Sequence, residues 1–522
     1  MSEAGRRNSY TTGSIGGTMI RTAFSMLPAT LAMSGYNIAD TFFVARLGTT
    51  PLAAMGFSFP VIMLVNCVYH GLGVGVMTTV AQALGGGRTA KAARIITAGL
   101  LLIAVVSVLV GMTGIACLDW TFAQFGATGE VLKPIRAYMM IWYLFGLTGS
   151  LGMAGNDLLI AAGDSKIAST VMCGGMIVNV ALDPLLIFGW GGIPGLGIQG
   201  AAIATVASQM VTAVIAIGWL YERHRLLTWA AFQWRLFKHI TRLVTRFAVP
   251  ATIGMLMMPI GNGVVTKIIA GFGDAAVAAT AAAGRIEAVA FVFPMSLGIT
   301  LLPMVGQNYG AYFYRRINQC RRFSMRFALY FELVMAVIYF LAAPRLAGFF
   351  SDDPEVVKIM VWYLRIIPVG FGLIEIHRYS GFFFTGCGKP GVSAWLNALR
   401  ILGLMVPFSL LALYFKSLIG VFAARLAADV IAGSVGWAAA HYLTSRLPAD
   451  AVSSAPKQGS RTAPSNNRQH TTILIMAILP ASDIGFAFSD IRKHNVSGRR
   501  SVRSAGFCAA PPASGHTDQA DS

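Results

Sequence analysis

The sequence predicts an all-α polytopic membrane protein with twelve transmembrane helices in two six-helix repeats. Three observations lead to this prediction. The 522 residues are 56% hydrophobic and 12% charged, and the mean hydropathy is +0.66, which is too apolar for a soluble chain of this length. Apolar runs of the length that spans a bilayer recur along the chain. One long stretch also occurs twice.

The duplicated stretch covers residues 37–85 and returns at 262–310, shifted by 225 positions without a gap. Eleven of its 49 positions are identical, including Asn37/Asn262, Thr41/Thr266, Gly48/Gly273, Gln82/Gln307 and Gly85/Gly310. An ungapped register of this length indicates an internal duplication. Asp40 of the first copy falls on Val265 of the second, so its carboxylate is not part of the shared scaffold.

Gly, Pro or charged residues separate the apolar runs, and each run predicts one span. The predicted spans are about 15–45, 51–82, 93–117, 134–161, 167–190, 197–221, 244–271, 276–308, 325–350, 356–385, 391–415 and 418–445. Residues 1 to 14 are polar and the first run is long enough to span, so no cleaved leader is expected. The six cysteines have no paired or metal-type spacing.

Composition predicts five regions along the chain. They are a polar N-terminal tail at 1–14, an N-terminal six-helix lobe at 15–222, a basic linker at 223–243, a C-terminal six-helix lobe at 244–447 and a tail at 448–522. The last region is rich in Ser, Pro, Arg and Ala, which predicts disorder.

The net charge of +19 is concentrated in the loops that follow even-numbered spans. The loops after odd-numbered spans are poor in Lys and Arg, and residues 351–355 (SDDPE) are acidic. The positive-inside rule therefore predicts that both termini are cytoplasmic. The basic excess indicates contact with membrane lipids rather than with nucleic acid.

Span 5 contains Asn179 and Asp183, which are four residues apart and share a helix face. A shift of 223 extends the repeat into this span and places Gly163 on Gly386, Lys166 on Lys389 and Pro184 on Pro407. The same shift leaves Asp183 opposite Val406. A central Asp costs about 2.5 to 3.5 kcal/mol in a membrane helix, which indicates a functional group. The alternative is a hydrogen-bonded pair that only fixes helix packing.

Several motifs together resemble the multidrug and toxic compound extrusion (MATE) transporters over about residues 15–445. They are YNIAD in span 1, AQALGGG after span 2 with its echo GQNYGA, AGDSK and TGCGKP after spans 4 and 10, and NVALDP in span 5. The resemblance implies two lobes around a central cavity that opens alternately to the two sides. It also implies an inner (plasma) membrane antiporter, monomeric and without an organic cofactor, that exports amphipathic, often cationic small molecules against H+ or Na+.

Within this family the chain is most similar to the damage-inducible bacterial branch. That resemblance implies a cation-coupling group made of Asp40, Asn156, Asn179, Asp183 and Thr205. It also implies that Na+, if it is the coupling ion, binds at Asp40 and Asp183, with no other metal site. One departure is Pro28, which lies closer to Asp40 than the family pattern leads us to expect.

The predicted substrate-cavity residues are Tyr36, Tyr138, Glu287 and Glu375. Tyr138 matches a family position in span 4, but 18 residues of helix would place it about 27 Å from Asn156. The two side chains therefore cannot share one ion unless the helix is broken.

The second lobe contains many charged residues within its predicted spans, namely Arg285, Glu287, Glu375, His377, Arg378, Arg400, Arg425 and Asp429. Charged groups at membrane depth face the protein interior and pair with one another. Two interpretations remain open, a structural salt-bridge network and a route for substrate or protons.

Other function classes have less support. The chain has no HExxH, GxSxG or P-loop motif, so an enzyme is not expected. It has no filter loop or ring of like charges that would indicate a channel. The alternative within the transporter class is a flippase for a lipid-linked precursor, which would use the cationic second lobe to bind pyrophosphate.

Overall fold

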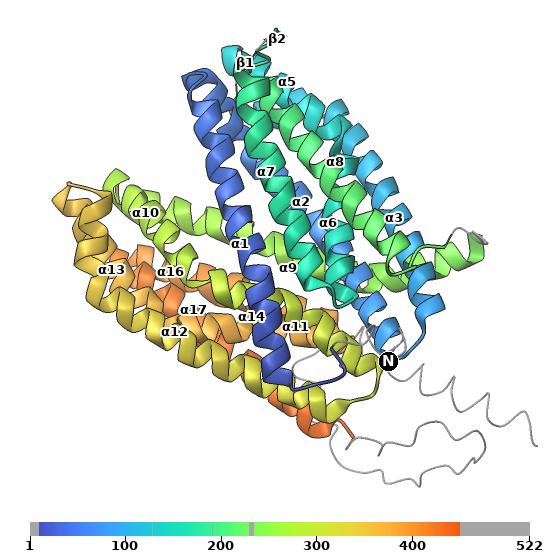
Figure 1. The fold of residues 1–522 in the computed structure, drawn as a ribbon. Helices are drawn as coiled ribbons and strands as arrows, with labels where there is room; N and C mark the ends of the chain where they lie inside the picture. The colour runs from blue at the N-terminus through green and yellow to red at the C-terminus, as the bar shows by residue number, and fades with distance from the viewer. Residues whose placement is uncertain (1–9, 128, 191, 229–233, 449–522) are drawn as a thin grey trace, which may run out of the picture. The chain divides into compact units, whose positions relative to one another are not determined.

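Helices form nearly all of the regular structure in this computed structural model (Figure 1). The structure describes residues 10–127, 129–190, 192–228 and 234–448, without the side chains of residues 34, 36–38, 190 and 193. Apart from residue 448, the predicted disordered tail lies outside the described residues, and that prediction is not tested.

The first half contains eight α-helices, a short 3-10 helix and a two-stranded hairpin. In chain order these are α1 (Ile15–Ala45), α2 (Thr49–Gly85), α3 (Thr89–Ala116), α4 (Leu118–Gln124), η2 (Gly129–Val131), α5 (Leu132–Leu144), α6 (Gly146–Ala161), α7 (Ser165–Phe188), β1 (Gly189–Trp190), β2 (Ile193–Pro194) and α8 (Ile198–Glu222). The strands β1 and β2 pair antiparallel.

The second half consists of helices in the described residues. They are α9 (Trp234–Ala270), α10 (Asp274–Ala290), α11 (Val292–Gly310), α12 (Tyr314–Phe350), α13 (Pro354–Ile366), η3 (Ile367–Gly370), α14 (Phe371–Gly386), α15 (Pro390–Ala398), the π-helical η4 (Leu399–Met405), α16 (Val406–Tyr414) and α17 (Leu418–Arg446). α9 begins inside the stretch 223–243 that we expected to be a linker.

The helices match the predicted class. Among the described residues, nine helical stretches are long and apolar enough to cross a membrane, and two bent pairs raise this number to eleven. α1, at 31 residues, is also long enough to span and completes the twelve expected spans.

Two spans that we expected to be continuous are broken. α5 and α6 meet at 52° and α10 and α11 at 57°. Pro294 explains the second break, because it lacks the N–H that would bond to Ala290, the last residue of α10. At the first break Gly146 brings the start of α6 close to the hydroxyl of Tyr69, and a Cβ there would lie 3.3 Å from it.

The backbone repeats the duplication seen in the sequence. Gly48 and Gly273 both have positive φ, +116° and +103°. Gly163 and Gly388 lie two residues after the ends of α6 and α14, with φ of +90° and +81° and with the same turn hydrogen bonds. The offset at this helix end is therefore 225, and the shift of 223 predicted from the sequence is wrong there, because the chain turns at the second glycine of TGCGKP. At either offset Asp183 falls on an apolar residue.

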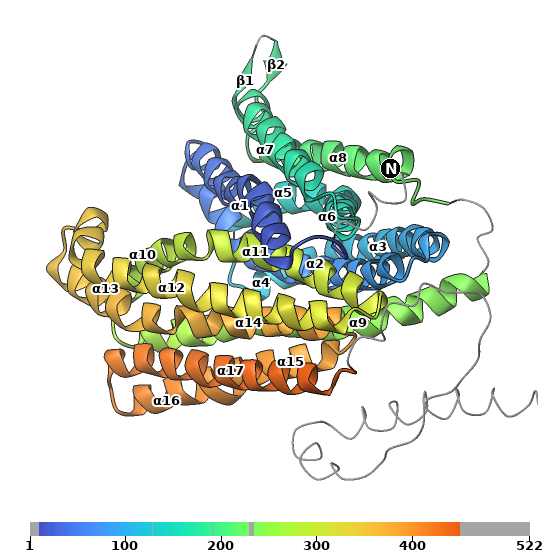
Figure 2. The same cartoon turned by 60° about the horizontal axis from the view of Figure 1, so that its bottom comes forward.

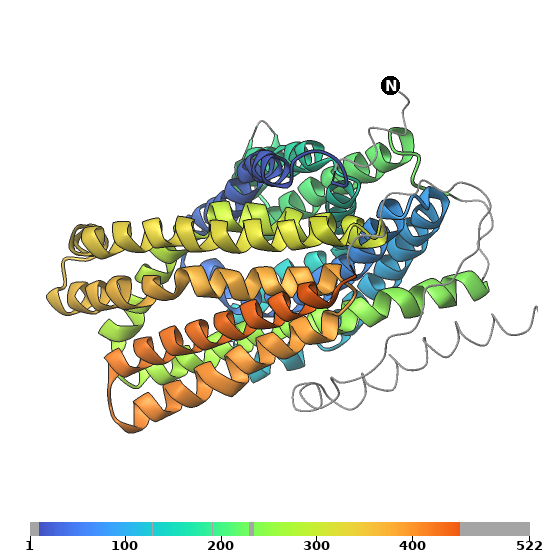
Figure 3. The same cartoon turned by 90° about the horizontal axis from the view of Figure 1, so that it is seen from below.

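Each half has hydrophobic clusters of its own, and two further clusters join buried residues of both halves. In the first half α1 packs on α7, and α6 and α7 pack on α8. In the second half α12, α14 and α17 pack side by side, as Figures 2 and 3 show in yellow and orange. Between the halves, α2 packs along α9 and α11, and α1 packs on α11.

The backbones of the two halves come into direct contact where α2 and α11 end, at glycines that the repeat makes equivalent. A Cβ on Gly85 would lie 1.9 Å from the carbonyl oxygen of Gln307, and a Cβ on Gly310 would lie 2.0 Å from that of Gln82. Only glycine permits this backbone contact. We call this side of the protein the basic face, because Lys and Arg residues gather at and just after the ends of α2, α8 and α11, namely Arg88, Lys91, Arg223, Arg225, Arg315 and Arg316.

The described part of the N-terminal tail packs against the second half. Tyr10 is completely buried, and Asn308 Nδ2 donates to its carbonyl oxygen at 2.9 Å. Arg316 donates to the carbonyl oxygen of Gly13 at 2.9 Å. Residues 10 to 13 of the predicted polar tail are therefore held against the second half.

Candidate functional site

Two carboxylates of the first half lie on neighbouring helices inside the protein. Asp40 of α1 is 4% exposed and Asp183 of α7 is completely buried. The helices are in contact at Gly35, whose Cβ would lie 2.9 Å from the Met176 side chain. Asp40 and Asp183 follow five and seven residues later, and the two carboxylates interact electrostatically. They therefore lie at the same level of the helix pair.

Polar side chains of α7 and α8 lie at the same level as these two carboxylates. Asn179 is completely buried, and its Nδ2 donates to Asp183 Oδ1 at 3.4 Å. α8 runs antiparallel to α7, since Gly200 lies against Leu186 and Gly175 against Thr212. This register places the buried Thr205 beside residues 180 to 182 of α7.

The carboxylates retain unused acceptor capacity. Among the described residues, Asp40 Oδ1, Asp183 Oδ2 and Asn179 Oδ1 have no hydrogen-bond donor. Buried polar atoms normally have a partner, so each exception requires an explanation. We call Asp40, Asn179, Asp183 and Thr205 the acidic group.

The remaining predicted site residues lie apart from the acidic group. Asn156 Nδ2 contacts Met172 Sδ at 3.0 Å, and Met172 precedes Asn179 by seven residues, about 10 Å along α7. Tyr138 is buried in α5, on the other side of the break at Phe145. The side chain of Tyr36 lies outside the described residues. The roles of these three residues stay predictions.

Sequence reasoning missed an acid next to Asn156. Asp157 lies against Gly73 of α2, where a Cβ would be 2.6 Å from its Oδ2. In the second half Gly298 lies against Phe382 in the same way, and both pairs are related by an offset of 225. The available signal was an acid with an apolar counterpart in the other copy, Phe382 for Asp157, and a counterpart of this kind, Val265, also singled out Asp40.

Several charged residues of the second half form ion pairs. Arg425 of α17 pairs with Glu287 of α10 and donates to the hydroxyl of Tyr363. Arg400, inside the π-helical η4, pairs with Asp429 at 2.7 Å. These contacts support the salt-bridge interpretation for Glu287, and its role as a substrate contact stays a prediction.

Glu375 belongs to a second group of charged residues in this half, which is more deeply buried than the pair of Arg425 and Glu287. It is completely buried, and its Oε2 lies 3.0 Å from Arg378. Glu332 of α12 is also completely buried, has no hydrogen-bond donor among the described residues and interacts electrostatically with Glu375. Sequence reasoning missed Glu332, although it is the one acid in the apolar run at 325–350.

In the described part of the chain, no group of three or more His, Cys, Asp or Glu side chains could hold a metal ion. The acidic group offers two carboxylates with amide and hydroxyl oxygens, a set that suits a proton or one hard monovalent cation.

The sequence pattern of the MatE family matches residues 26–185 and 250–411, one segment in each half. The chain belongs to the MatE family. Its two matches correspond to the two copies of the duplication.

Individual relatives align with nearly the whole described chain. A protein of Shewanella oneidensis named FAD transporter is 31% identical over 84% of this chain and 97% of its own length. The multidrug export protein MepA of Staphylococcus saprophyticus is 23% identical over 83% of this chain and 95% of its own.

Among solved structures, the MATE transporter VcmN of Vibrio cholerae in its bent form is 27% identical. It aligns with a TM-score of 0.78 over 82% of this chain and 97% of its own. The predicted twelve-helix fold of this MATE protein is therefore confirmed. Its assignment to the damage-inducible branch stays a prediction.

Proposed function

We propose that this MATE protein is a cation-coupled antiporter in which Asp40 and Asp183 bind the coupling ion, H+ or Na+, while an amphipathic compound is exported. The observation that supports this most is the position of two buried carboxylates at the same level of the neighbouring helices α1 and α7. Among the described residues neither has an ion-pair partner. Like charges in a low-dielectric interior repel, and a cation bound between them relieves the repulsion.

Coupling requires that the cation and the substrate favour different conformations of the transporter. A ligand shifts a conformational equilibrium only through its different affinities for the two states. Asp40 lies on α1 and Asp183 on α7, so the distance between the carboxylates changes whenever the two helices move against each other. The cation then favours the arrangement in which the carboxylates are close.

We place the basic face in the cytoplasm, with both termini on that side of the inner membrane. Lys and Arg residues cluster at and just after the ends of α2, α8 and α11, as the positive-inside rule requires. A cysteine introduced at Arg88, an exposed position on the basic face, and labelled by an impermeant reagent from outside intact cells would contradict this orientation.

The deciding experiment is export from proteoliposomes driven separately by a pH gradient and by a Na+ gradient. Asp40→Asn should abolish gradient-driven export while the protein still inserts and binds substrate. Glu375→Gln is the matched control, because it removes the charge of an equally buried carboxyl in the other half and should retain cation dependence. Undiminished driven export by Asp40→Asn, or loss of cation dependence only in Glu375→Gln, would reject the assignment.

A second candidate concerns the substrate. The Shewanella oneidensis relative is named FAD transporter, and FAD combines an aromatic ring system with a pyrophosphate. Lys267 of α9 and Arg285 of α10 are exposed within predicted spans and have no ion-pair or hydrogen-bond partner among the described residues. They could bind a pyrophosphate, which the lipid-linked precursor of the flippase alternative also contains.

The substrate classes can be separated in one set of vesicles. Export of FAD and of the cationic dye ethidium should be measured for the natural sequence and for Lys267→Gln with Arg285→Gln. If the protein transports FAD, the double variant should lose FAD export and keep dye export. A drug exporter should transport the dye and ignore FAD, and a flippase should move only a lipid-linked pyrophosphate.

A further inference from the structure

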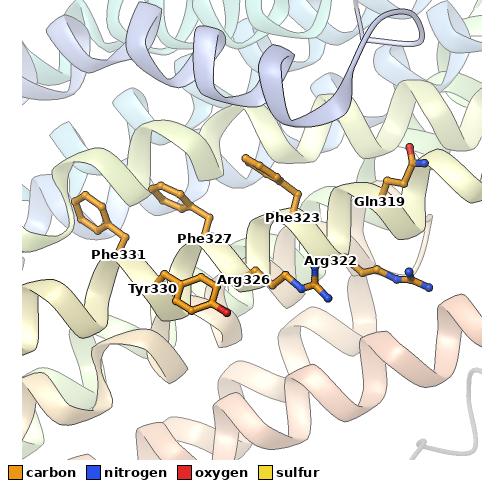
Figure 4. Close-up of a pocket in the computed structure, with 7 residues that line it drawn as sticks. All are labelled: Gln319, Arg322, Phe323, Arg326, Phe327, Tyr330 and Phe331. Carbon is orange, nitrogen blue, oxygen red and sulfur yellow. The ribbon is translucent and has the colours of Figure 1, made fainter.

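An open groove of about 620 Å³ runs along the exposed side of α12, near its beginning on the basic face. Figure 4 shows Phe323, Phe327 and Phe331 in a row, with Arg322 and Arg326 beside them. These residues recur every four positions, so each set forms a stripe along one side of the helix. The groove therefore combines an aromatic wall with a cationic edge.

The cationic edge has no counter-charge within the described protein. Arg322 and Arg326 are both exposed, and neither forms an ion pair or hydrogen bond with another described residue. Buried Arg321 on the neighbouring side is different, because it contacts Asn318 and His441. An arginine pair one helical turn apart provides guanidinium groups that suit a phosphate.

The position of the arginines along α12 matches a lipid headgroup. The predicted apolar run of this helix begins at residue 325, so the two arginines lie at the boundary between headgroups and acyl chains. Basic residues at this depth attract anionic lipids by about 1 kcal/mol each. A zwitterionic headgroup would bring an ammonium against the same arginines.

An exposed apolar track leads away from the arginines along the same helix. Tyr330 is 70% exposed, Leu333 62% and Val337 52%. The rise from Arg326 to Val337 is about 16 Å, close to half of the roughly 30 Å hydrocarbon core. The track is thus as long as the acyl chain of one leaflet.

The aromatic wall connects the groove to the first half. Phe327 and Phe331 pack on Phe293 of α11 at 5.6 and 5.7 Å between ring centroids. Phe293 in turn contacts Phe24 of α1 at 5.0 Å. α1 also contains Asp40, so an occupant of the groove lies two aromatic contacts away from a helix of the acidic group.

We propose that this groove binds one anionic phospholipid. Its phosphate lies between Arg322 and Arg326, and an acyl chain follows Tyr330, Leu333 and Val337. By ordering the Phe327 and Phe331 wall, the lipid stabilises the packing of α1 on the second half.

Native mass spectrometry of the full chain in detergent tests this inference with phosphatidylglycerol as the probe. Phosphatidylcholine with the same acyl chains tests whether binding depends on the charge of the headgroup. Glycerol 3-phosphate, which has no acyl chain, tests whether the phosphate alone binds. Arg322→Gln with Arg326→Gln should weaken binding of the first bound phosphatidylglycerol by roughly 30-fold. It should leave phosphatidylcholine binding unchanged, and glycerol 3-phosphate should not bind.

The matched control is Arg235→Gln with Arg242→Gln in α9, which removes two exposed charges and should leave that first binding event unchanged. Both variants should unfold at the natural temperature in detergent, which excludes a folding defect. Equal weakening in both variants, or none in either, would overturn the proposal. Displacement of the lipid by FAD with the same arginine dependence would also overturn it, because the groove would then be a substrate site.

Discussion

Gln82 and Gln307 donate matching hydrogen bonds between the two halves. Gln82 Nε2 donates to the carbonyl oxygen of Gly386 at 2.9 Å, and Gln307 Nε2 donates to that of Ala161 at 2.8 Å. The donors are 225 positions apart and so are the acceptors. The duplication therefore produced a symmetric pair of bonds that holds the halves together on the basic face.

Removing either glutamine side chain should weaken this closure by about the same amount. A hydrogen bond contributes about 0.5 to 1.5 kcal/mol net, so Gln82→Ala and Gln307→Ala should each shift the equilibrium towards opening at the basic face by about 2- to 12-fold. Spin-label distances across the two halves measure this shift. Gln199→Ala is the control and should leave the equilibrium unchanged, because Gln199 is exposed at the end of α8 that lies away from the basic face. Opposite effects of the two glutamine variants would contradict the symmetric arrangement.

Alanine at Gly85 or Gly310 should have a stronger effect than either glutamine variant. The added Cβ meets a backbone carbonyl at about 2 Å, which no side-chain rotation can relieve, so α2 and α11 must separate. Export should fall by more than tenfold, since each 1.4 kcal/mol of clash is a factor of ten in the closed population. Gly284→Ala is the control, because nothing lies within 4 Å of its Cβ. Normal export by Gly85→Ala would show that the close approach is not needed.

A contact on the basic face should make stability depend on acid pH. Asp164 accepts from His224 Nε2 at 3.0 Å and from Trp219 Nε1 at 3.4 Å. The hydrogen bond from His224 holds the pKa of Asp164 below its usual value. This stabilisation is therefore complete above pH of about 4, the unfolded value, and is lost as the pH falls through the lower folded pKa.

Thermal unfolding between pH 7 and pH 3 tests this prediction. Asp164→Asn should lower the unfolding temperature at pH 7 and reduce its dependence on acid pH. Asp352→Asn, at an exposed position of the opposite face, should behave like the natural protein. An unchanged pH profile of Asp164→Asn would mean that the contact with His224 contributes nothing.

The pair Arg425 and Glu287 should show strong coupling in a double-mutant cycle. Arg425→Gln leaves Glu287 and Asp429 without the guanidinium, and a hydrogen bond to a charged group contributes about 1.5 to 3 kcal/mol. The double variant Arg425→Gln with Glu287→Gln should lose less than the sum of the single variants, with a coupling of about 0.5 to 3 kcal/mol. Chemical unfolding in detergent measures these values, with exposed Arg345→Gln as the control. Additive losses would show that the two residues are independent.

The sequence by itself determined the class of this protein and much of its plan. Hydropathy depends on local composition, so the twelve spans could be located from runs of apolar residues. The duplication made Asp40 and Asp183 conspicuous, because a comparison of the two copies removes what belongs to the shared scaffold. The same comparison carried through the end of α6 would have found Asp157.

Only the tertiary structure decided how the spans bend and which polar groups meet. Hydropathy does not distinguish a straight span from one broken at Phe145, because bending depends on neighbours such as Tyr69 that are distant in the chain. The sequence placed Asn156 with the acidic group, whereas its contact with Met172 depends on the register between α6 and α7. Gln82 and Gln307 were visible as identical residues, but their partners lie in the opposite half. Such pairings arise from packing between helices, and composition along one helix does not encode them.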